Sequence, residues 1–470
     1  MKKRLSICLL LVVCVLLGML QLPASATNDG ISCHTLAADV ALDGADKKLD
    51  TAKAVILYEM NTDTLVYGYN ADKLVNPTGL VKLLTVLVAL EKGNLEDIVT
   101  VKQSTLKTVA VGSVSARLKS GEEISLRDLL YCIMVSSAND ACAVVAAHIG
   151  GNQADFVTMM NEKALQLGCS SSNFTNAHGL TDEAQYSTAR DLAIITKAAL
   201  ENPLFAEMFG MTTATVAATN KSDERSLKTT NNMMREDQRN YDSRVTGGKP
   251  AAATTSDRSM VCTAQVGTAN YLCVVMNTKA SVSEDGMVIL RYGIFEEMSA
   301  LLDYAQQGFE IRQILDDSQA MYHYAIAGGE NGVVLRPSRD VSVVLPKDCD
   351  AEKLHFYHTV NMPTLTAPIS QGQKLGQLTI SYGNLIMGTC ELLAMNAVAQ
   401  DGSSITDAER LDVSQMEEVS IWKQILSYAA FILLGGLAVV ALVTAAIRGV
   451  RNAKIRSQQR RRARSRKRSR

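Results

Sequence analysis

Three short segments, far apart in the sequence, hold residue types that can transfer protons or bind a carboxylate. They are Pro77–Thr85, Ser136–Ala141 and Val245–Ala251. The first contains Lys82 within a stretch that predicts a helix from Gly79 to Glu91. Residues three apart share one face of a helix, so Lys82 would lie beside the side chain of residue 79. That residue is a glycine and offers no side chain.

The order and surroundings of these segments resemble the serine D-Ala-D-Ala carboxypeptidases, the low-molecular-weight penicillin-binding proteins. That family combines Ser-x-x-Lys, Ser-x-Asn and Lys-Thr-Gly motifs around one cleft. The stretches 118–122, 176–180 and 186–193 are similar to the family's spacer segments, and Arg258 falls in register after the third motif. The resemblance covers about residues 50 to 450. It implies an α/β transpeptidase domain of the penicillin-binding and β-lactamase type, then a small all-β domain and a transmembrane helix.

The resemblance also implies a role for each motif. A serine, activated by the lysine three residues later, would attack the carbonyl between two D-alanines. The Ser-x-Asn pair would transfer protons, and the Lys-Thr-Gly strand would bind the substrate carboxylate and complete an oxyanion hole. The catalytic positions are then Gly79, Lys82, Ser137, Asn139 and Lys249, and the substrate-binding positions are Pro250, Ala251 and Ala252. No cofactor is implied.

Three of these positions depart from the family pattern. Gly79 replaces the nucleophilic serine, Pro250 replaces the threonine and Ala251 replaces the glycine of the third motif. Proline removes a hydroxyl and a backbone donor, and alanine adds a β-carbon where a close approach is needed. These departures favour a catalytically inactive, wall-binding or scaffolding pseudoenzyme of peptidoglycan metabolism. The alternative is an active or weakly active carboxypeptidase that trims peptidoglycan stem peptides with Thr78 or an activated water. A sensor of muropeptides or β-lactams is a third possibility.

Other residues have simpler interpretations. Literal Ser-x-x-Lys matches at Ser104–Lys107 and Ser420–Lys423 lack the flanking context of the first motif. We expect structural roles for a histidine, two aspartates and two methionines: His178, Asp140, Asp191, Met159 and Met160. Cys132 and Cys142 lie in apolar helical surroundings, which predicts buried thiols. The cysteines show no C-x-x-C spacing, so no metal site is expected.

The two ends of the chain predict export and membrane anchoring. Residues 1–26 have the basic start, apolar stretch and Ala24-Ser25-Ala26 of a signal peptide. A transmembrane helix is predicted over 421–447, because Ile425–Ile447 is 23 uncharged residues long, enough to cross a hydrocarbon core of about 30 Å. By the positive-inside rule the basic tail, 448–470, would be cytoplasmic. The chain is therefore expected to span the cell membrane once, with its main domains outside the cytoplasm.

The charges are distributed unevenly along the chain. The tail holds 12 Lys or Arg, and without these and the three of the signal peptide, 32 basic residues stand against 48 acidic ones. An acidic exported part gives no reason to expect nucleic-acid binding. A polybasic segment directly inside a membrane helix is typical of contact with anionic lipid. The expected partners are thus a peptidoglycan stem peptide or another wall component, the membrane and its anionic lipid.

Between the anchors, the patterns predict two domains. The carboxypeptidase-like domain would span 27–310, with strands at 54–58, 64–67, 259–263 and 271–276 and helical segments at 79–91 and 126–150. A small β-rich domain would span 311–400, with strands such as 341–345 and 378–382. An acidic stalk at 401–420 would lead to the membrane.

Overall fold

The structure is a computed structural model that describes residues 51–252, 257–283, 289–291, 293–329, 332–360, 365–383 and 385–400. The predicted signal peptide, acidic stalk, membrane helix and basic tail lie outside these ranges. Among the described residues, none of the helices has both the length and the apolar character needed to cross a membrane. The chain divides into two compact units. The first comprises the residues up to 323, 334–363 and 369–397, and the second is made of 324–333, 364–368 and the residues from 398.

The centre of the first unit is a five-stranded sheet in the order β2-β1-β9-β8-β7. Its strands are β1 (Ala54–Glu59), β2 (Thr64–Tyr69), β7 (Val245–Ala252), β8 (Asp257–Val266) and β9 (Ala269–Lys279). β1 pairs antiparallel with both β2 and β9, so the two ends of this part of the chain lie side by side. The prediction of a sheet built from strands at both ends is confirmed.

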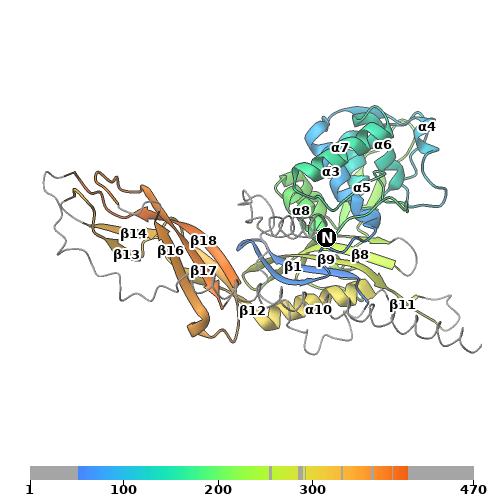
Figure 1. The fold of residues 1–470 in the computed structure, drawn as a ribbon. Helices are drawn as coiled ribbons and strands as arrows, with labels where there is room; N and C mark the ends of the chain where they lie inside the picture. Colours follow the sequence, from blue (N-terminus) through green and yellow to red (C-terminus); the bar gives the residue numbers. More distant parts are fainter. Residues whose placement is uncertain are drawn as a thin grey trace, which may run out of the picture. The chain divides into compact units, whose positions relative to one another are not determined.

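Both faces of this sheet are covered, which accounts for the nearly continuous apolar sequence of β1. Alternate side chains of a strand point to opposite faces. Ala54, Ile56 and Tyr58 join a core made largely with the helices that follow β2. Val55 and Leu57 join a second core with α10 (Gly293–Gly308). In Figure 1, α10 lies along one face of the sheet, and α3 and α8 lie on the other.

The helical layer consists of short helices, some of which begin with a polar capping side chain. Its members are η1 (Thr78–Leu80), α3 (Val81–Lys92), α4 (Gln103–Leu106), α5 (Leu126–Met134), α6 (Asn139–Ile149), α7 (Gln153–Gln166), α8 (Ala189–Leu200), α9 (Pro203–Gly210) and η2 (Asn232–Met234). At the start of α5 and α8, the side chains of Ser125 and Thr188 accept a backbone N–H from the first turn. Two hairpins accompany the helices: β3 (Ile98–Thr100) with β4 (Glu123–Ser125), and β5 (Thr213–Val216) with β6 (Arg225–Lys228).

Both predicted helical segments differ from the structure in detail. The segment 79–91 begins with a 3-10 turn, and the α-helix starts at Val81. The segment 126–150 is two helices, because the chain leaves the helix after Met134 and α6 begins at Asn139. Between them Ser137 has a left-handed φ of 62°, which a continuous helix does not allow. The predicted single helix joined the apolar stretches on either side of the polar residues Ser136-Ser137 and Asn139-Asp140, where the chain leaves the helix.

The β-rich part begins where α10 ends, with β12 (Phe309–Leu315) paired to β15 (Val341–Pro346). A five-stranded sheet follows in the order β13-β14-β18-β17-β16. Its strands are β13 (Tyr322–Tyr324), β14 (Val333–Pro337), β16 (Leu354–Val360), β17 (Lys374–Tyr382) and β18 (Leu385–Ala394). The predicted strands 341–345 and 378–382 fall within β15 and β17. The remaining described elements are β10 (Ser281–Val282), β11 (Ile289–Arg291) and η3 (Ala351–Lys353).

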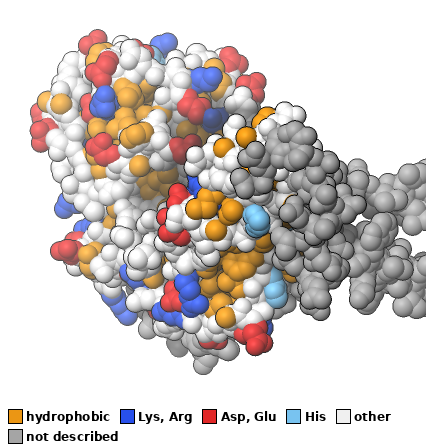
Figure 2. All heavy atoms as spheres, turned by 90° about the vertical axis from the view of Figure 1, so that its left-hand side faces the viewer, with side chains coloured by type: hydrophobic (Ala, Val, Ile, Leu, Met, Phe, Trp, Pro, Cys, Tyr) orange, Lys and Arg blue, Asp and Glu red, His pale blue; other side chains and the backbone are white. Residues whose placement is uncertain are grey.

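Some hydrophobic side chains lie at the surface. On the face drawn in Figure 2, they gather in several groups, with histidines beside some of them. In the β-rich part, the edge strand β16 carries two exposed aromatic residues, Phe356 and Tyr357. On the same strand, the His358 ring stacks on Tyr322 with ring centroids 3.8 Å apart. These residues give β16 an aromatic surface.

Candidate active site

The first motif lies at the turn that leads into α3. The Asn76 side chain accepts the backbone N–H of Thr78, and the Leu80 N–H returns to the carbonyl of Pro77, which together form the turn. Lys82 follows one turn later and is only 3% exposed. Its Nζ donates to the backbone carbonyl of His178. A carbonyl of the loop at residue 178 therefore holds the amine of Lys82, the residue that the family resemblance assigns to activating a nucleophile at position 79.

The third motif lies on β7, at the edge of the central sheet. Lys249 is 1% exposed, and its Nζ donates to the carbonyl of Met134 at the end of α5, 3.0 Å away. Pro250 stands opposite Met260 of β8. A proline is tolerated on an edge strand where its missing donor faces away from the neighbour. The backbone N–H groups of successive residues in a strand point alternately to its two sides. The N–H of Ala252, an exposed residue two positions after Pro250, therefore points to the same outer edge of the sheet as the nitrogen of Pro250.

Gly79 and Ala251 lie against each other. A Cβ at residue 79 would lie 3.3 Å from the Cβ of Ala251 and 3.3 Å from Nζ of Lys82. Both distances are shorter than ordinary van der Waals contact, so either neighbour would have to move by a few tenths of an ångström. The Ala251 methyl thus crowds the space that a side chain at position 79 would need. The two departures from the family pattern are physically linked.

The second motif connects α5 to α6. Ser137 is half-buried with its left-handed φ, and Asn139, the first residue of α6, is 5% exposed. One turn further along α6, the thiol of Cys142 interacts electrostatically with both Lys82 and Lys249. The structure therefore brings the first and third motifs together through the contacts of Gly79, and places the start of α6 beside their lysines.

The electrostatics of this cleft are dominated by burial. Burial lowers the pKa of Lys249 to about 7, and the nearby charge of Lys82 contributes in the same direction. Burial also lowers the pKa of Lys82. The same cause raises the pKa of the Cys142 thiol to about 11 and lowers the pKa of His178 to about 4. At neutral pH, both the thiol and the imidazole are uncharged.

The loop that carries His178 approaches the first motif very closely. Gly179 has a φ of 81°, and a Cβ there would lie 2.0 Å from the carbonyl oxygen of Thr78. Its N–H is held by the side chain of Asn176, and Nδ1 of His178 accepts the N–H of Leu180. These bonds confirm a structural role for His178. Sequence reasoning did not predict the close approach of Gly179, for which the Asn-Ala-His-Gly spacer was the available signal, and it predicted Cys142 as a buried thiol without placing it near the two lysines.

The other structural predictions are also confirmed. Asp140 accepts hydrogen bonds from Ser115 Oγ and from the backbone of residues 116 and 118, and Asp191 accepts bonds from residues 171 and 172. Met160 is fully buried, and Met159 packs against the same core. Cys132 and Cys142 are buried free thiols.

The alternative nucleophiles lack a supporting geometry. Thr78 Oγ1 is buried and has no hydrogen-bond partner, so no base is in contact with it. Thr78 also has a φ of 52°, which is unfavourable for a β-branched residue. Ser104 lies on α4 and lines a different cavity with Thr105 and His148. Ser420 lies outside the described residues.

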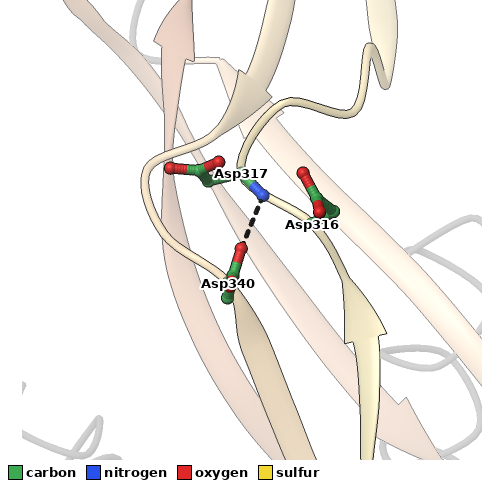
Figure 3. Close-up of side chains that lie close together, drawn as sticks. All are labelled: Asp316, Asp317 and Asp340. Atoms are coloured by element: carbon green, nitrogen blue, oxygen red, sulfur yellow. Dashed lines mark hydrogen bonds between the residues drawn. The ribbon is translucent and has the colours of Figure 1, made fainter.

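Three exposed aspartates approach one another in the β-rich part. Figure 3 shows Asp316, Asp317 and Asp340, whose carboxylate oxygens lie within 4.8 Å of one another. Asp340 accepts the N–H of Asp317 at 2.9 Å, and Asp316 accepts the N–H and the hydroxyl of Ser318. These turn hydrogen bonds account for the closeness of the carboxylates, and an exposed acidic group alone does not make a metal site.

Comparison with known proteins decides the family. Residues 44–280 match the D-alanyl-D-alanine carboxypeptidase family, peptidase S11, and residues 309–400 match the C-terminal domain of penicillin-binding protein 5. The chain belongs to the D-alanyl-D-alanine carboxypeptidase family. The resemblance stated from the motifs is confirmed, and so is its fold: a penicillin-binding-protein transpeptidase domain followed by an all-β domain.

Relatives of this carboxypeptidase family cover most of the chain. The D-alanyl-D-alanine carboxypeptidase DacD of Salmonella typhimurium is 27% identical over 377 residues, which are 78% of this chain and 91% of that protein. DacD of Escherichia coli is 29% identical over 335 residues, covering 69% and 81%. The crystal structure of penicillin-binding protein 5 from Haemophilus influenzae superposes with a TM-score of 0.60 at 26% identity, covering 74% of this chain and 98% of that one.

Proposed function

We propose that this chain is a non-hydrolysing member of the carboxypeptidase family that binds peptidoglycan stem peptides in its cleft and acts in wall metabolism by binding or assembly. The observation that carries the proposal is the contact at the start of α3. Residue 79 has no side chain, and the place of its Cβ is already within 3.3 Å of Lys82 Nζ and Ala251 Cβ. Lys82 instead donates to a backbone carbonyl. No side-chain oxygen is therefore available at the nucleophile position.

Parts of the family's site are still present. Lys82, Lys249 and the start of α6 converge, and β7 is the last strand of its sheet, with no further strand paired to its outer edge among the described residues. The Ala252 N–H faces this edge, as an oxyanion donor would. Loss of the nucleophile in a serine hydrolase typically lowers turnover about a millionfold while binding remains. Binding without hydrolysis is the behaviour that this arrangement supports.

A fluorescent penicillin tests the proposal directly, because acylation of a serine leaves a stable covalent label. The full chain is compared with the variant Gly79→Ser, Pro250→Thr, Ala251→Gly. We expect label on the triple variant alone. Stable label on the unmodified chain would overturn the proposal and favour the weakly active carboxypeptidase, and Thr78→Ala would then show whether Thr78 carries it. If neither protein is labelled, binding of a D-Ala-D-Ala peptide to the unmodified chain decides whether the cleft still works.

The proposal places this cleft outside the cell membrane, anchored by residues 421–447 with the basic tail 448–470 at anionic lipid. It rests on the apolar span and the charge asymmetry of the sequence. Carbonate extraction of membranes from cells that make the full chain should leave it in the membrane pellet. Release into the supernatant, as with a chain ending at residue 420, would contradict the anchor.

A further inference from the structure

The middle of the central sheet contains two cysteines that face each other. Cys262 of β8 and Cys273 of β9 are direct partners in the antiparallel pairing of these two strands. Both are fully buried in the core that the sheet forms with α10. Their row continues to Leu57 of β1 on one side and to Gly248 of β7 on the other. The pair therefore lies in the interior of the sheet, with a strand on each side.

The spacing of these two residues fits a disulfide. Partner residues in an antiparallel pair have Cα atoms about 4.5–5.5 Å apart, and disulfides occur at Cα separations of about 4.4–6.8 Å. Their β-carbons point to the same face of the sheet at about 4.5–5.5 Å, close to the separation of about 3.5–4.5 Å that a disulfide needs. The Cys262 thiol donates a hydrogen bond to the Cys273 thiol, so the sulfur atoms already face each other. No other two cysteines among the described residues are partners in a strand pairing.

Two other roles for the pair have less support. A thiol pair can bind a soft metal ion, but a structural zinc takes four ligands, and among the described residues no third His, Cys, Asp or Glu completes a ligand group with these cysteines. A reactive thiol needs a lowered pKa, whereas the hydrogen bond to Cys273 and burial raise the pKa of Cys262 well above its ordinary value. The thiols of the folded protein are therefore unreactive, and a bond between them has to form before the core closes.

We propose that Cys262 and Cys273 form a disulfide that links β8 to β9 and is made while the exported chain folds. The inference rests on the location proposed above, outside the cell membrane, because thiols stay reduced in the cytoplasm. The reaction is exchange with a protein or small-molecule disulfide. One cysteine thiolate attacks that disulfide and displaces its first thiol, and the second cysteine then attacks the mixed disulfide and displaces the other. Two electrons and two protons pass from the cysteine pair to the oxidant, which leaves as two thiols.

The link would stabilise the part of the sheet that carries the third motif. It closes the short segment 262–273, and such a cross-link reduces the freedom of the unfolded chain. The disulfide form should therefore melt about 5–10 °C above the dithiol form that the structure describes. Since β8 also pairs with β7, the link supports the strand on which Lys249 lies.

Thiol trapping of the full chain tests for this bond directly. Cells that make the chain are lysed in denaturant with N-ethylmaleimide, and the purified chain is digested with trypsin. No Lys or Arg lies between Arg258 and Lys279, so both cysteines fall in one peptide, Ser259–Lys279. Mass spectrometry should find that most copies of this peptide carry no maleimide and lack two hydrogen atoms. After prior reduction the peptide should carry two maleimides.

The matched control is the peptide Asp128–Lys163, which also holds two buried cysteines, Cys132 and Cys142, that are not strand partners. It should carry two maleimides without reduction. Maleimide on most copies of Ser259–Lys279 without reduction overturns the inference. A control peptide free of maleimide also overturns it, because oxidation would then not depend on the pairing of β8 with β9.

Thermal unfolding gives a second measurement. A chain reduced in denaturant and refolded with reductant should melt about 5–10 °C below the untreated chain, whereas Cys273→Ala should melt at the same temperature after either treatment. Equal melting temperatures for the unmodified chain overturn the link. Should the variant not fold, trapping in the unmodified chain still decides. A chain that stays in the membrane pellet with both thiols labelled overturns this inference alone and leaves the proposed function standing.

Discussion

The crowding between Gly79 and Ala251 makes a quantitative prediction about stability. Gly79→Ala places a methyl 3.3 Å from the Cβ of Ala251 and from Nζ of Lys82. Overpacking of this kind costs about 1–3 kcal/mol, and the loss of glycine's freedom in the unfolded chain returns about 0.4–1 kcal/mol. We expect Gly79→Ala to lower the free energy of unfolding by about 0.5–2 kcal/mol. Ala251→Gly alone should lower it by about 0.5–1 kcal/mol, because glycine weakens a strand.

The double variant Gly79→Ala, Ala251→Gly should be more stable than the summed effects of the two single substitutions predict. Removing the Ala251 methyl relieves one of the two contacts, so the coupling free energy should be favourable by about 0.5–1.5 kcal/mol. Urea unfolding of the full chain, followed by circular dichroism, measures all four proteins. The matched control combines Gly79→Ala with Ala264→Gly, a substitution in the core on the opposite face of the sheet. The effects of these two substitutions on the free energy of unfolding should add within about 0.5 kcal/mol. Additivity of the Gly79 and Ala251 changes would refute the argument that the two positions share one space.

Two further predictions concern the surroundings of the cleft. Gly179→Ala should destabilise the folded protein by about 2–5 kcal/mol, because it places an alanine in the left-handed region and a methyl 2.0 Å from the Thr78 carbonyl oxygen. The control Gly168→Ala, at a φ of 84° with open space around it, should cost only about 1–2 kcal/mol. Equal losses of stability in thermal unfolding would contradict the close approach at Gly179. Lys249 binds fewer protons in the folded than in the unfolded state above pH 7, so it should make stability rise with pH by up to about 1.4 kcal/mol per unit between pH 7 and pH 8.5. Lys249→Met should lose this rise in urea unfolding, and an unchanged slope would show that the lysine is not buried as described.

The layout of the transpeptidase domain could be predicted because its strongest signals are local. The strands over 54–58 and 271–276 are apolar, β-branched and bounded by polar turns, and both lie within strands of the central sheet. The family resemblance then supplied what local patterns cannot, namely that three segments far apart in the sequence, at 77–85, 136–141 and 245–251, belong to one site. The contacts of Gly79 with Ala251 and of Lys249 with Met134 agree with that expectation.

The details that decide the chemistry could not be predicted, since they depend on distances of a few tenths of an ångström. Gly79 and Ala251 each departed from a motif, but only the structure shows that the Ala251 methyl crowds the place of a Cβ at residue 79. The break at Ser137 depends on a left-handed φ of 62°, which hydrophobic periodicity does not report. Cys142 was predicted only as a buried thiol, since its position near both lysines depends on how α6 packs against α3.

The two buried lysines separate a binding role from a purely structural one. As structural groups, they connect α3 to the His178 loop and β7 to the end of α5 through single hydrogen bonds. One hydrogen bond contributes a net of about 0.5–1.5 kcal/mol to the stability of the folded protein. Removing a charged amine from water can cost several kcal/mol, and this cost is the cause of the lowered pKa of Lys249. A methionine would fill much of the same volume without that loss. The two lysines are therefore costly as purely structural groups, and the peptide binding proposed above would give them a second role.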